Sequence, residues 1–309
     1  MTKEFSGDPG ENVMKIINIG SLNIDRIYGV EHFVQPGETI KVRTYSEACG
    51  GKGLNQSIAA ARSGAEVHHA GAVGSDGGML LEILRISGVH TGKTKILSGA
   101  SGHAVIQVDK NGQNNIIICG GANDAVSMGM IDDALREISE GDIVLLQNEI
   151  SNVGYAVEQA KKAGAKIALN PSPFNEKLND VDMSKISYFL MNEVEGEQIT
   201  GFSEPEKIID RVVELYPEAK IVLTLGNDGA IYADKNVRYH QPIFKVQAVD
   251  TTAAGDTFTG YFLAGIIEGM EIPEILKMSA KASSIAVTRQ GAVPSIPYRE
   301  EVLASLKED

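Results

Sequence analysis

The sequence predicts an α/β fold in which helices cover both faces of a mostly parallel central sheet. Short apolar segments of buried-strand length alternate with helical patterns through most of the chain, and this alternation is typical of parallel strands joined by crossover helices. Two stretches with β character interrupt the alternation and indicate a small additional sheet. With 309 residues, of which 43% are hydrophobic, the chain can bury a large core.

Apolar segments of strand length provide the expected strands of the central sheet. They lie at residues 13–19, 142–146, 166–169, 188–191 and 220–225. Helical periodicity lies between and after them, at residues 53–63, 128–138, 153–163, 205–216 and 261–268. Strand and helix therefore follow one another along most of the chain, as a sheet with helices on both faces requires.

The two interruptions lie at residues 24–48 and 103–118. The first contains an alternating segment at 40–45, and the second reads as two strands joined at Asn111-Gly112, a strong hairpin signal. We expect both to form antiparallel β structure that meets beside the ligand-binding edge of the sheet as a lid. An ordinary edge hairpin is the alternative. The predicted organisation is a flexible leader at residues 1–12 and one domain at 13–309, with a discontinuous lid at about 24–48 and 101–120.

Charge and cysteine content exclude several classes of protein. The net charge of −13 at pH 7 argues against general binding to nucleic acid or to an anionic membrane, so an anionic substrate would need a locally positive site. Cys49 and Cys119 lie far apart and outside any C-x-x-C spacing, which indicates neither a disulfide framework nor a zinc site and favours a cytoplasmic location. No apolar stretch reaches the roughly 18 residues of a membrane-spanning helix.

The run from Asp250 to Asp256 is the sharpest chemical motif. Ala253, Ala254 and Gly255 are small residues at the start of a predicted helix, where backbone N–H groups and the helix dipole bind phosphate well. The Asp256 carboxylate in the first turn could accept the proton of a hydroxyl that attacks the phosphoryl group. Alternatively, Asp256 is only a favourable first-turn acid and Asp250 a turn residue.

A glycine-rich loop at residues 49–56 precedes a second helix of small residues. Its spacing fits neither the P-loop nor the G-x-G-x-x-G fingerprint of dinucleotide-binding proteins. Lys52 and Asn55 could instead donate hydrogen bonds to a polyhydroxylated ligand, while glycines such as Gly51 let its ring approach the backbone. A tight helix-initiating turn with a solvated lysine is the alternative.

Polar residues also follow several predicted strands, where open α/β sheets bind ligands. Asn23, Asp25 and Glu149 could bind sugar hydroxyls, although each could equally be a turn residue. Asn192 and Glu195 share one face of a starting helix and could hold Mg²⁺ through water, but that spacing is also capping chemistry. At residues 224–229 the glycines could make room for nucleotide phosphate and ribose, or simply form a turn.

Together these elements, from Lys15 to Lys307, resemble the ribokinase family of carbohydrate kinases. The segment Gly-Gly-Lys-Gly-x-Asn-Gln at residues 50–56 is similar to the sugar loop of those members that act on a pentose. The resemblance implies a ribokinase-like α/β body with a β lid and ATP-dependent phosphorylation of the 5-hydroxyl of D-ribose. The implied sugar ligands are Asn23, Asp25, Gly51, Lys52, Asn55 and Glu149, and Asp256 is the implied base.

The same resemblance assigns the phosphate, nucleotide and metal positions. It implies an anion hole formed by Ala253, Ala254 and Gly255. The implied ATP-binding residues are Asn192, Thr224, Leu225, Gly226, Asn227, Asp228, Gly229 and Gly255. Glu195 would bind Mg²⁺ through water. A potassium site is implied at Asp250, Thr252, Ala286, Arg289, Gly291 and Ser295, largely through backbone carbonyls. Lids of two subunits would clasp each other in a homodimer, with which the apolar residues at 116–118 agree.

Three alternative functions follow from the same residues. The family machinery could act on deoxyribose, another sugar or a nucleoside, and Ser101-Gly102-His103 departs from the pattern of relatives at the lid. A catalytically silent sugar-binding sensor is a second alternative, against which the intact Asp256 and the Gly-Gly-Lys-Gly loop argue. An NAD-binding dehydrogenase lacks the expected glycine fingerprint after the first strand.

Overall fold

The computed structural model describes residues 14–308, and within them the central sheet has nine strands in the order β13-β12-β11-β10-β9-β8-β1-β4-β5. The seven strands from β11 to β5 run parallel, whereas β12 pairs antiparallel with both β11 and β13. The strand bounds are β1 Ile16–Ile19, β4 Val67–Val73, β5 His90–Ile96, β8 Ile143–Gln147, β9 Lys166–Asn170, β10 Tyr188–Asn192, β11 Lys220–Thr224, β12 Ala230–Ala233 and β13 Arg238–Gln241. The predicted mostly parallel sheet is confirmed, and the predicted leader lies outside the described residues.

Helices cover both faces of this sheet because its inner strands are apolar on both sides. Along β8, Val144 and Leu146 face one core, and Ile143 and Leu145 face the other. The first core packs against α3 (Met128–Leu135), α4 (Val153–Lys162), α5 (Glu193–Thr200) and α6 (Pro205–Leu215). The second packs against α1 (Lys52–Arg62), α2 (Gly78–Ile86), α7 (Ala254–Glu268) and α8 (Ile272–Ala286). The last helix, α9 (Arg299–Ser305), packs on α7 and α8.

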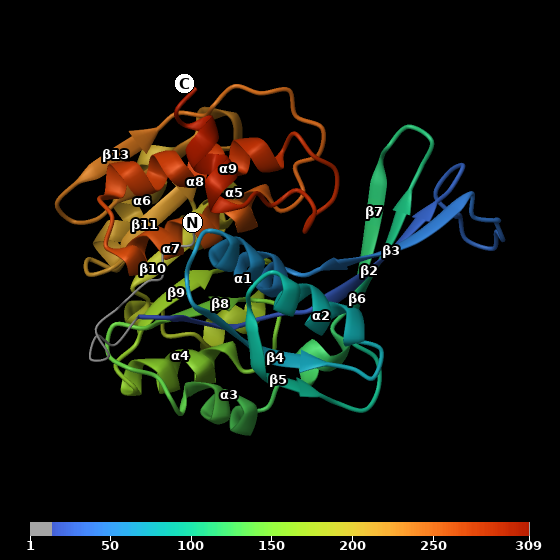
Figure 1. The fold of residues 1–309 in the computed structure, drawn as a ribbon, viewed down its shortest axis with the longest axis horizontal. Helices are drawn as coiled ribbons and strands as arrows, with labels where there is room; N and C mark the ends of the chain where they lie inside the picture. Colours follow the sequence, from blue (N-terminus) through green and yellow to red (C-terminus); the bar gives the residue numbers. More distant parts are fainter. Residues whose placement is uncertain (1–13, 309) are drawn as a thin grey trace, which may run out of the picture.

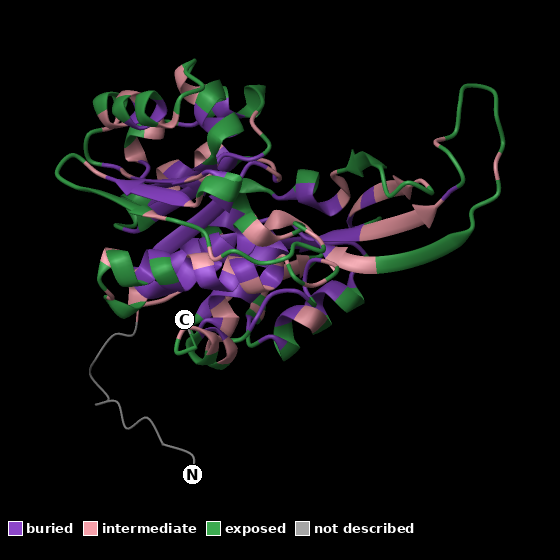
Figure 2. Cartoon of the chain, turned by 90° about the horizontal axis from the view of Figure 1, so that it is seen from above, coloured by how far each residue is buried: buried purple, intermediate pink, exposed green. Residues whose placement is uncertain are grey.

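The two interruptions of the alternation meet in space as a four-stranded sheet, here called the lid, in the order β3-β2-β6-β7. Its strands are β2 Asn23–Gly29, β3 Thr44–Gly50, β6 Gly102–Val108 and β7 Asn114–Cys119. Figure 1 shows the lid projecting from the body. Figure 2 shows that the body holds most of the buried residues, whereas the lid is mostly intermediate or exposed. The four strands match the predicted ranges to within two residues, since β2 begins at Asn23 and β3 ends at Gly50.

Two details of the lid prediction were wrong. Only Thr44 and Tyr45 of the alternating segment 40–45 lie in a strand, because β3 continues instead to Gly50, where it leads into α1. The lid is also not wholly antiparallel, because β2 and β6 pair in parallel. Both of these strands leave the body in the same direction, and each returns through an antiparallel partner, β3 or β7.

Candidate active site

Helix α7 begins with a left-handed residue opposite the ends of β10 and β11. Its N-cap, Ala253, has φ 60°, a conformation that costs an alanine of order 1 kcal/mol and must be held by the surrounding structure. The N–H of Ala254 turns back to the carbonyl of Thr251 over 3.2 Å. Gly255 and Asp256 are then the second and third residues of the helix. At these positions the backbone N–H groups have no hydrogen-bond acceptor within the helix, because no helical turn precedes them. These two amides can bind an anion in the cavity.

The Asp256 carboxylate is held in place by two side-chain amides from α1. Asn55 Nδ2 donates to Oδ2 and Gln56 Nε2 donates to Oδ1, each over 2.9 Å. Asp256 is 9% exposed, so the carboxylate faces the cavity in one fixed orientation. Asn55 was predicted to contact a ligand, but its side-chain N–H group donates to Asp256 instead. Its Oδ1 atom is buried and has no hydrogen-bond partner among residues 14–308.

Gln56, which the sequence did not single out, belongs to a buried polar network below the site. Its Oε1 accepts from Gln147 Nε2 over 2.7 Å, and the same nitrogen is 3.1 Å from Asn18 Oδ1. Asn18 Nδ2 in turn donates to Ser57 Oγ over 2.9 Å, and this hydroxyl lies 2.8 Å from Nδ1 of His69. Burial lowers the pKa of His69 to about 4, so its ring is neutral. The network joins α1 to β1, β8 and β4.

The glycine-rich loop is tied to the body by Glu149. This carboxylate accepts the N–H of Lys52 over 3.0 Å and the hydroxyl of Ser21, through Oε2 in both cases. It thereby satisfies an N–H at the start of α1, where Gly51 at φ 95° offers no side-chain cap. Burial raises the pKa of Glu149 above its ordinary value, although the bonds from Ser21 and the charge of Lys52 oppose the shift. The predicted ligand residue therefore also has a structural role.

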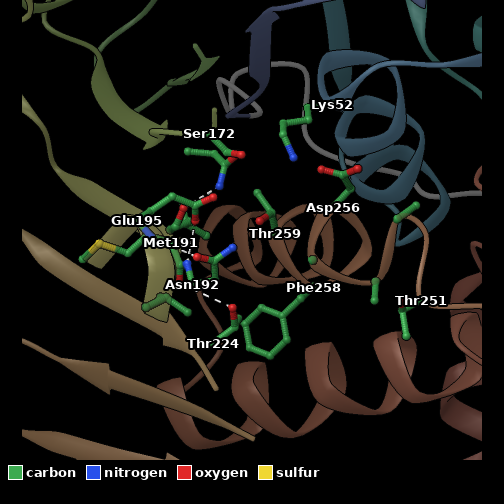
Figure 3. Close-up of a pocket in the computed structure, with 16 residues that line it drawn as sticks. Lys52, Ser172, Met191, Asn192, Glu195, Thr224, Thr251, Asp256, Phe258 and Thr259 are labelled. Carbon is green, nitrogen blue, oxygen red and sulfur yellow. Dashed lines mark hydrogen bonds between the residues drawn. The ribbon is translucent and has the colours of Figure 1, made fainter. Parts of the chain in front are cut away.

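The Lys52 side chain reaches the cavity between α1 and α7. Burial alone would lower its pKa, but the charges of Asp256, Glu149 and Glu195 more than offset this effect and leave the pKa raised. Lys52 therefore carries a positive charge inside an otherwise acidic cavity. Figure 3 shows Lys52 and Asp256 approaching the same space, so a local positive charge lines the cavity together with the first residues of α7.

Asn23 and Asp25 lie at the base of the lid, beside the glycine-rich loop. Asn23 Oδ1 accepts from the buried Asn123 over 2.8 Å, a residue that the sequence did not indicate. Burial, with a smaller contribution from Glu149, raises the pKa of Asp25 to about 6. A Cβ atom at Gly50 would lie 2.1 Å from Asp25 Oδ2, so this position requires glycine. The structure thus brings the predicted sugar-binding residues together.

The cavity itself extends from Lys52 and Asp256, its polar end, between β10, β11 and α7. The predicted sugar ligands Asn23, Asp25, Gly51, Asn55 and Glu149 are not among the residues of 14–308 that line it. Asn192, predicted to bind nucleotide, and Glu195 form a capping box at the start of α5, with bonds of 2.8 and 3.0 Å. The capping alternative is thus confirmed, but both residues also line the cavity. Asn170 lines it as well, and its buried Oδ1 has no hydrogen-bond partner among the described residues. Carboxylate and amide oxygens therefore gather opposite Lys52.

A second, more apolar part of the cavity adjoins the first through Thr224, Thr251 and Gly255. Gly226, Asn227 and Gly229 line it as predicted, whereas Leu225 and Asp228 are not among the residues of 14–308 that line either part. The opposite wall was not predicted. An irregular loop, which gives no periodic signal, provides Ile243, Phe244, Val246 and Ala248, and the end of α8 with the residue after it provides Ala280, Ser283, Ser284 and Val287.

The side chains of the predicted potassium site are engaged with the protein itself. Asp250 Oδ1 accepts the N–H of Thr252 over 2.9 Å, and Oδ2 accepts the N–H of Gly291 over 2.9 Å. These bonds outweigh burial and lower the pKa of Asp250. The Arg289 guanidinium pairs with Glu301. Ser295 Oγ donates to the Ala292 carbonyl over 2.6 Å, and Ala286 ends α8 fully buried. A cation here would depend on backbone carbonyls.

Comparison with known proteins identifies the family. A family model described as pfkB family carbohydrate kinase matches residues 14–299. The chain belongs to the pfkB family of carbohydrate kinases. A ribokinase from Haemophilus influenzae is 36% identical over 298 residues, which cover 94% of this pfkB chain and 97% of the relative. A deoxyribokinase from Salmonella typhimurium is 32% identical over 305 residues, covering 93% and 97%.

Solved structures of pfkB kinases share the fold. The ribokinase of Thermotoga maritima superposes with a TM-score of 0.87 at 38% identity and covers 95% of this chain and 99% of its own. The ribokinase of Arabidopsis thaliana, solved with ribose and ATP, gives 0.84 at 31% identity, covering 96% and 99%. The ribokinase-like fold and the reaction class, an ATP-dependent carbohydrate kinase, are therefore confirmed. Within residues 14–308, no helix is both long enough and apolar enough to span a membrane.

Proposed function

We propose that this kinase transfers the γ-phosphoryl group of ATP to the 5-hydroxyl of D-ribose. The observation that carries this proposal is the position of Asp256. Its carboxylate is fixed by Asn55 and Gln56 at the third residue of α7, beside the backbone N–H groups of Gly255 and Asp256, which can hold a phosphoryl oxygen. A base and an anion-binding site thus share one helix turn, as phosphoryl transfer to an alcohol requires.

The sugar is assigned to the polar end of the cavity. Asp25 and Glu149 accept hydroxyl hydrogens there, while Lys52 and Asn23 add polar contacts from the loop and the lid. The unpartnered Asn55 Oδ1 accepts one further hydroxyl. Gly51 lets the sugar ring approach the backbone. Support for a pentose comes from the ribokinases of H. influenzae and A. thaliana, the second of which was solved with ribose.

In the chemical step, Asp256 takes the proton of the 5-hydroxyl as the sugar oxygen attacks the γ-phosphorus. The bond from that phosphorus to the β,γ-bridging oxygen breaks, and ADP leaves. Negative charge on the transferred group is stabilised by the free N–H groups of Gly255 and Asp256 in the first turn of α7. They lie beside Ala253 and Ala254 of the predicted anion hole, whose Ala254 N–H already donates to the Thr251 carbonyl. Lys52 adds a positive charge nearby.

The nucleotide is assigned to the adjoining apolar part of the cavity. We assign its phosphates to Asn192, Thr224 and Gly255, and its ribose and base to the segment of Leu225, Gly226, Asn227, Asp228 and Gly229. Ile243, Phe244 and Val246 offer an apolar wall for the purine. The ribokinase of A. thaliana with bound ATP supports this assignment.

Mg²⁺ fits the oxygen-rich wall of the cavity. Glu195 and Asn170 line it, and Asn170 Oδ1 has no hydrogen-bond partner among the described residues. Oxygen ligands that act through water suit this ion, and its charge would neutralise the phosphate oxygens of ATP. We also propose a potassium ion at the loop of Asp250 and Thr252, which is tied to Gly291 by a 2.9 Å bond.

We further propose a homodimer formed through the lid. Ile116, Ile117 and Ile118 on β7 are 52, 65 and 63% exposed, an apolar run that a second lid would cover. This contact also accounts for a sheet that projects from the body (Figure 1).

A panel of sugars tests the proposed reaction. ADP release would be measured with Mg²⁺, K⁺, ATP and either D-ribose, 2-deoxy-D-ribose, fructose or adenosine. The proposal expects the highest kcat/KM for D-ribose. A preference for 2-deoxyribose would favour the second candidate, which the similarity to the S. typhimurium deoxyribokinase supports. Sugar binding without ADP release from any member would instead indicate a sensor.

A further inference from the structure

Glu66, His68 and His90 form a cluster of metal-ligating side chains outside the active-site cavity. The imidazole nitrogen and carboxylate oxygen atoms that they offer all lie within 4.8 Å of one another. His68 Nε2 is 2.9 Å from Glu66 Oε1. The rings of His68 and His90 stack with centroids 4.6 Å apart and planes inclined by 22°. We propose that this cluster binds one divalent transition-metal ion such as Zn²⁺, Ni²⁺ or Co²⁺.

The backbone holds all three residues in register. His68 pairs with Ile17 of β1 on one side and with His90 of β5 on the other. The carbonyl of Glu66 accepts the N–H of Ile16 over 2.9 Å. An irregularity in the pairing of β4 with β5 follows directly after His68, and such bulges re-aim side chains. Two imidazoles and a carboxylate are thus presented from fixed positions of the sheet.

The distances between the three ligand atoms would fit a metal ion after a small movement of the side chains alone. Zinc lies about 2.0–2.2 Å from nitrogen and oxygen ligands, so its tetrahedral ligands are about 3.4 Å apart. Glu66 and His90 are exposed and His68 is partly exposed. Rotation of these side chains can therefore bring the three ligand atoms together while the strands stay in place. Water would fill the remaining coordination position, as in open zinc sites with two histidines and a glutamate.

The ligand chemistry separates this site from the Mg²⁺ of the kinase reaction. Imidazole suits zinc, nickel and copper, whereas Mg²⁺ takes oxygen ligands. The position differs too. His68 is the second residue of β4, at the amino end of the parallel strands, whereas Asn192 and Thr224 end β10 and β11 at the opposite side. Bound metal would tie the edge strand β5 to β4 (Figure 1).

Two other histidines help to define the site. The neighbouring His69 is turned into the core, where its ring nitrogens meet Ser57 and the Gly20 carbonyl, so it is no ligand. His32 lies 2.8 Å from Glu38 in an exposed pair on the lid loop. Among residues 14–308, the cluster at Glu66 alone has three such groups within reach of one ion. The His32 pair is therefore a matched control.

The test uses full-length protein without an affinity tag, treated with a chelator and then freed of it. Co²⁺ is titrated while its visible absorption is followed, and thermal unfolding is measured with and without Zn²⁺. We expect one saturable Co²⁺ site per chain and a melting temperature raised by a few degrees Celsius, because an ion that binds only the folded state stabilises it. Phosphoryl transfer with Mg²⁺ should be unchanged by the chelator treatment.

The variants decide whether this cluster is the site. His68→Asn and His90→Asn should each weaken Co²⁺ binding by at least about tenfold, since even the loss of an outer-shell partner of a metal ligand costs that much. His32→Asn should bind as the wild type does. If a histidine variant unfolds, Glu66→Gln replaces it as the test of Co²⁺ binding, because Glu66 is at an exposed position. Absence of saturable Co²⁺ binding, or equal binding by all variants, would overturn the proposal, whatever the result of the sugar panel.

Discussion

Gln56 Nε2 donates a hydrogen bond of 2.9 Å to Oδ1 of Asp256, and this bond joins the sugar loop on α1 to the first turn of α7. Gln56 also accepts from Gln147 over 2.7 Å, which leaves its amide group a single orientation. The proposed base is therefore aimed by a residue that has no proposed contact with either substrate. Gln56 is a positioning residue, and its removal should be visible in turnover.

Gln56→Met should lower kcat by about ten- to hundredfold, because a hydrogen bond to a charged group contributes about 1.5–3 kcal/mol. KM for ATP should change little, since the nucleotide part of the cavity does not include this residue. Steady-state kinetics checks both values, and thermal unfolding checks that the variant is folded. Gln113→Met, at an exposed turn of the lid, is the matched control. An unchanged kcat in Gln56→Met would show that Asn55 alone fixes the carboxylate.

Asp256→Asn should lower kcat by about 10²-fold or more, the usual scale for the loss of a general base. Sugar and ATP should still bind, because the loop, the lid and the nucleotide part of the cavity are untouched. Kinetics and equilibrium binding of both substrates provide the measurements. Asp132→Asn on α3, an exposed acid that bonds Tyr155, controls for the change of charge. Turnover equal to that of the wild type would remove Asp256 from its proposed role.

The sequence predicts the parts of the site that are local and misses the parts that depend on tertiary contacts. Small residues followed by an acid mark the start of α7 within one short segment. The bonds from Gln56 and Asn55 to Asp256, in contrast, join residues 200 and 201 positions apart in the chain, and no local pattern records them. Gln147 reads as an ordinary polar residue at the end of a strand until its partners are known.

Strand prediction fails for a similar reason. β4 was not predicted, because His68 and His69 interrupt its apolar pattern. His69 is nevertheless fully buried, since Ser57 and the Gly20 carbonyl satisfy its ring. The alternating segment 40–45 shows the opposite error, because its pattern predicts β structure where most of the segment forms none. Alternation also occurs in exposed loops, and residues 41–45 are exposed, so no buried face demands a strand there.

The raised pKa of Asp25 predicts a pH-dependent stability. Burial and Glu149 raise the pKa from 3.8 to about 6. The folded state therefore holds this proton more tightly than the unfolded state, so the contribution of Asp25 to stability is present below about pH 4 and is lost as the pH rises through about 6. Asp25→Asn should be more stable than the wild type at pH 8, by about 1–3 kcal/mol, and the gain should vanish near pH 4.

Urea unfolding at pH 4, 6 and 8 measures this difference. Asp228→Asn, whose carboxylate is exposed, is the control and should show no such crossover. A constant difference between Asp25→Asn and the wild type at all three pH values would mean that the carboxyl titrates normally. If Asp25 accepts a sugar hydroxyl in its ionised form, as proposed, KM for ribose in the wild type should also rise as the pH falls below about 6.

Potassium should raise turnover several-fold over sodium at equal ionic strength. The physical reason is the loop of Asp250 and Thr252, which leads directly into the N–H groups at the start of α7, so an ion that orders this loop also orders the anion hole. Initial rates in KCl, NaCl and choline chloride measure the effect. Asp250→Asn, which weakens the bonds to Thr252 and Gly291, should reduce the preference for potassium. Equal rates in all three salts would rule out the proposed cation site.

Ile116→Lys should weaken dimerisation more than Ile117→Lys, because the two residues point to opposite faces of the lid. The pairing register places Asp25 beside Ala104 and Ala104 beside Ile118. One face of the lid therefore carries Asp25 with Ile27, Ile106, Ile116 and Ile118, whereas the other carries Ile117 with the ion pair of Arg26 and Glu47. The face that carries Asp25, a proposed sugar ligand, is thus the apolar one.

A lysine introduced on that apolar face would be buried without a partner in the clasped dimer, which costs several kcal/mol. We therefore expect the dimer dissociation constant of Ile116→Lys to rise by at least about tenfold, with a smaller change for Ile117→Lys. Sedimentation equilibrium over a range of concentrations measures both. Equal effects of the two substitutions would place the contact on both faces or outside the lid. A wild-type chain that stays monomeric at high concentration would exclude the clasp altogether.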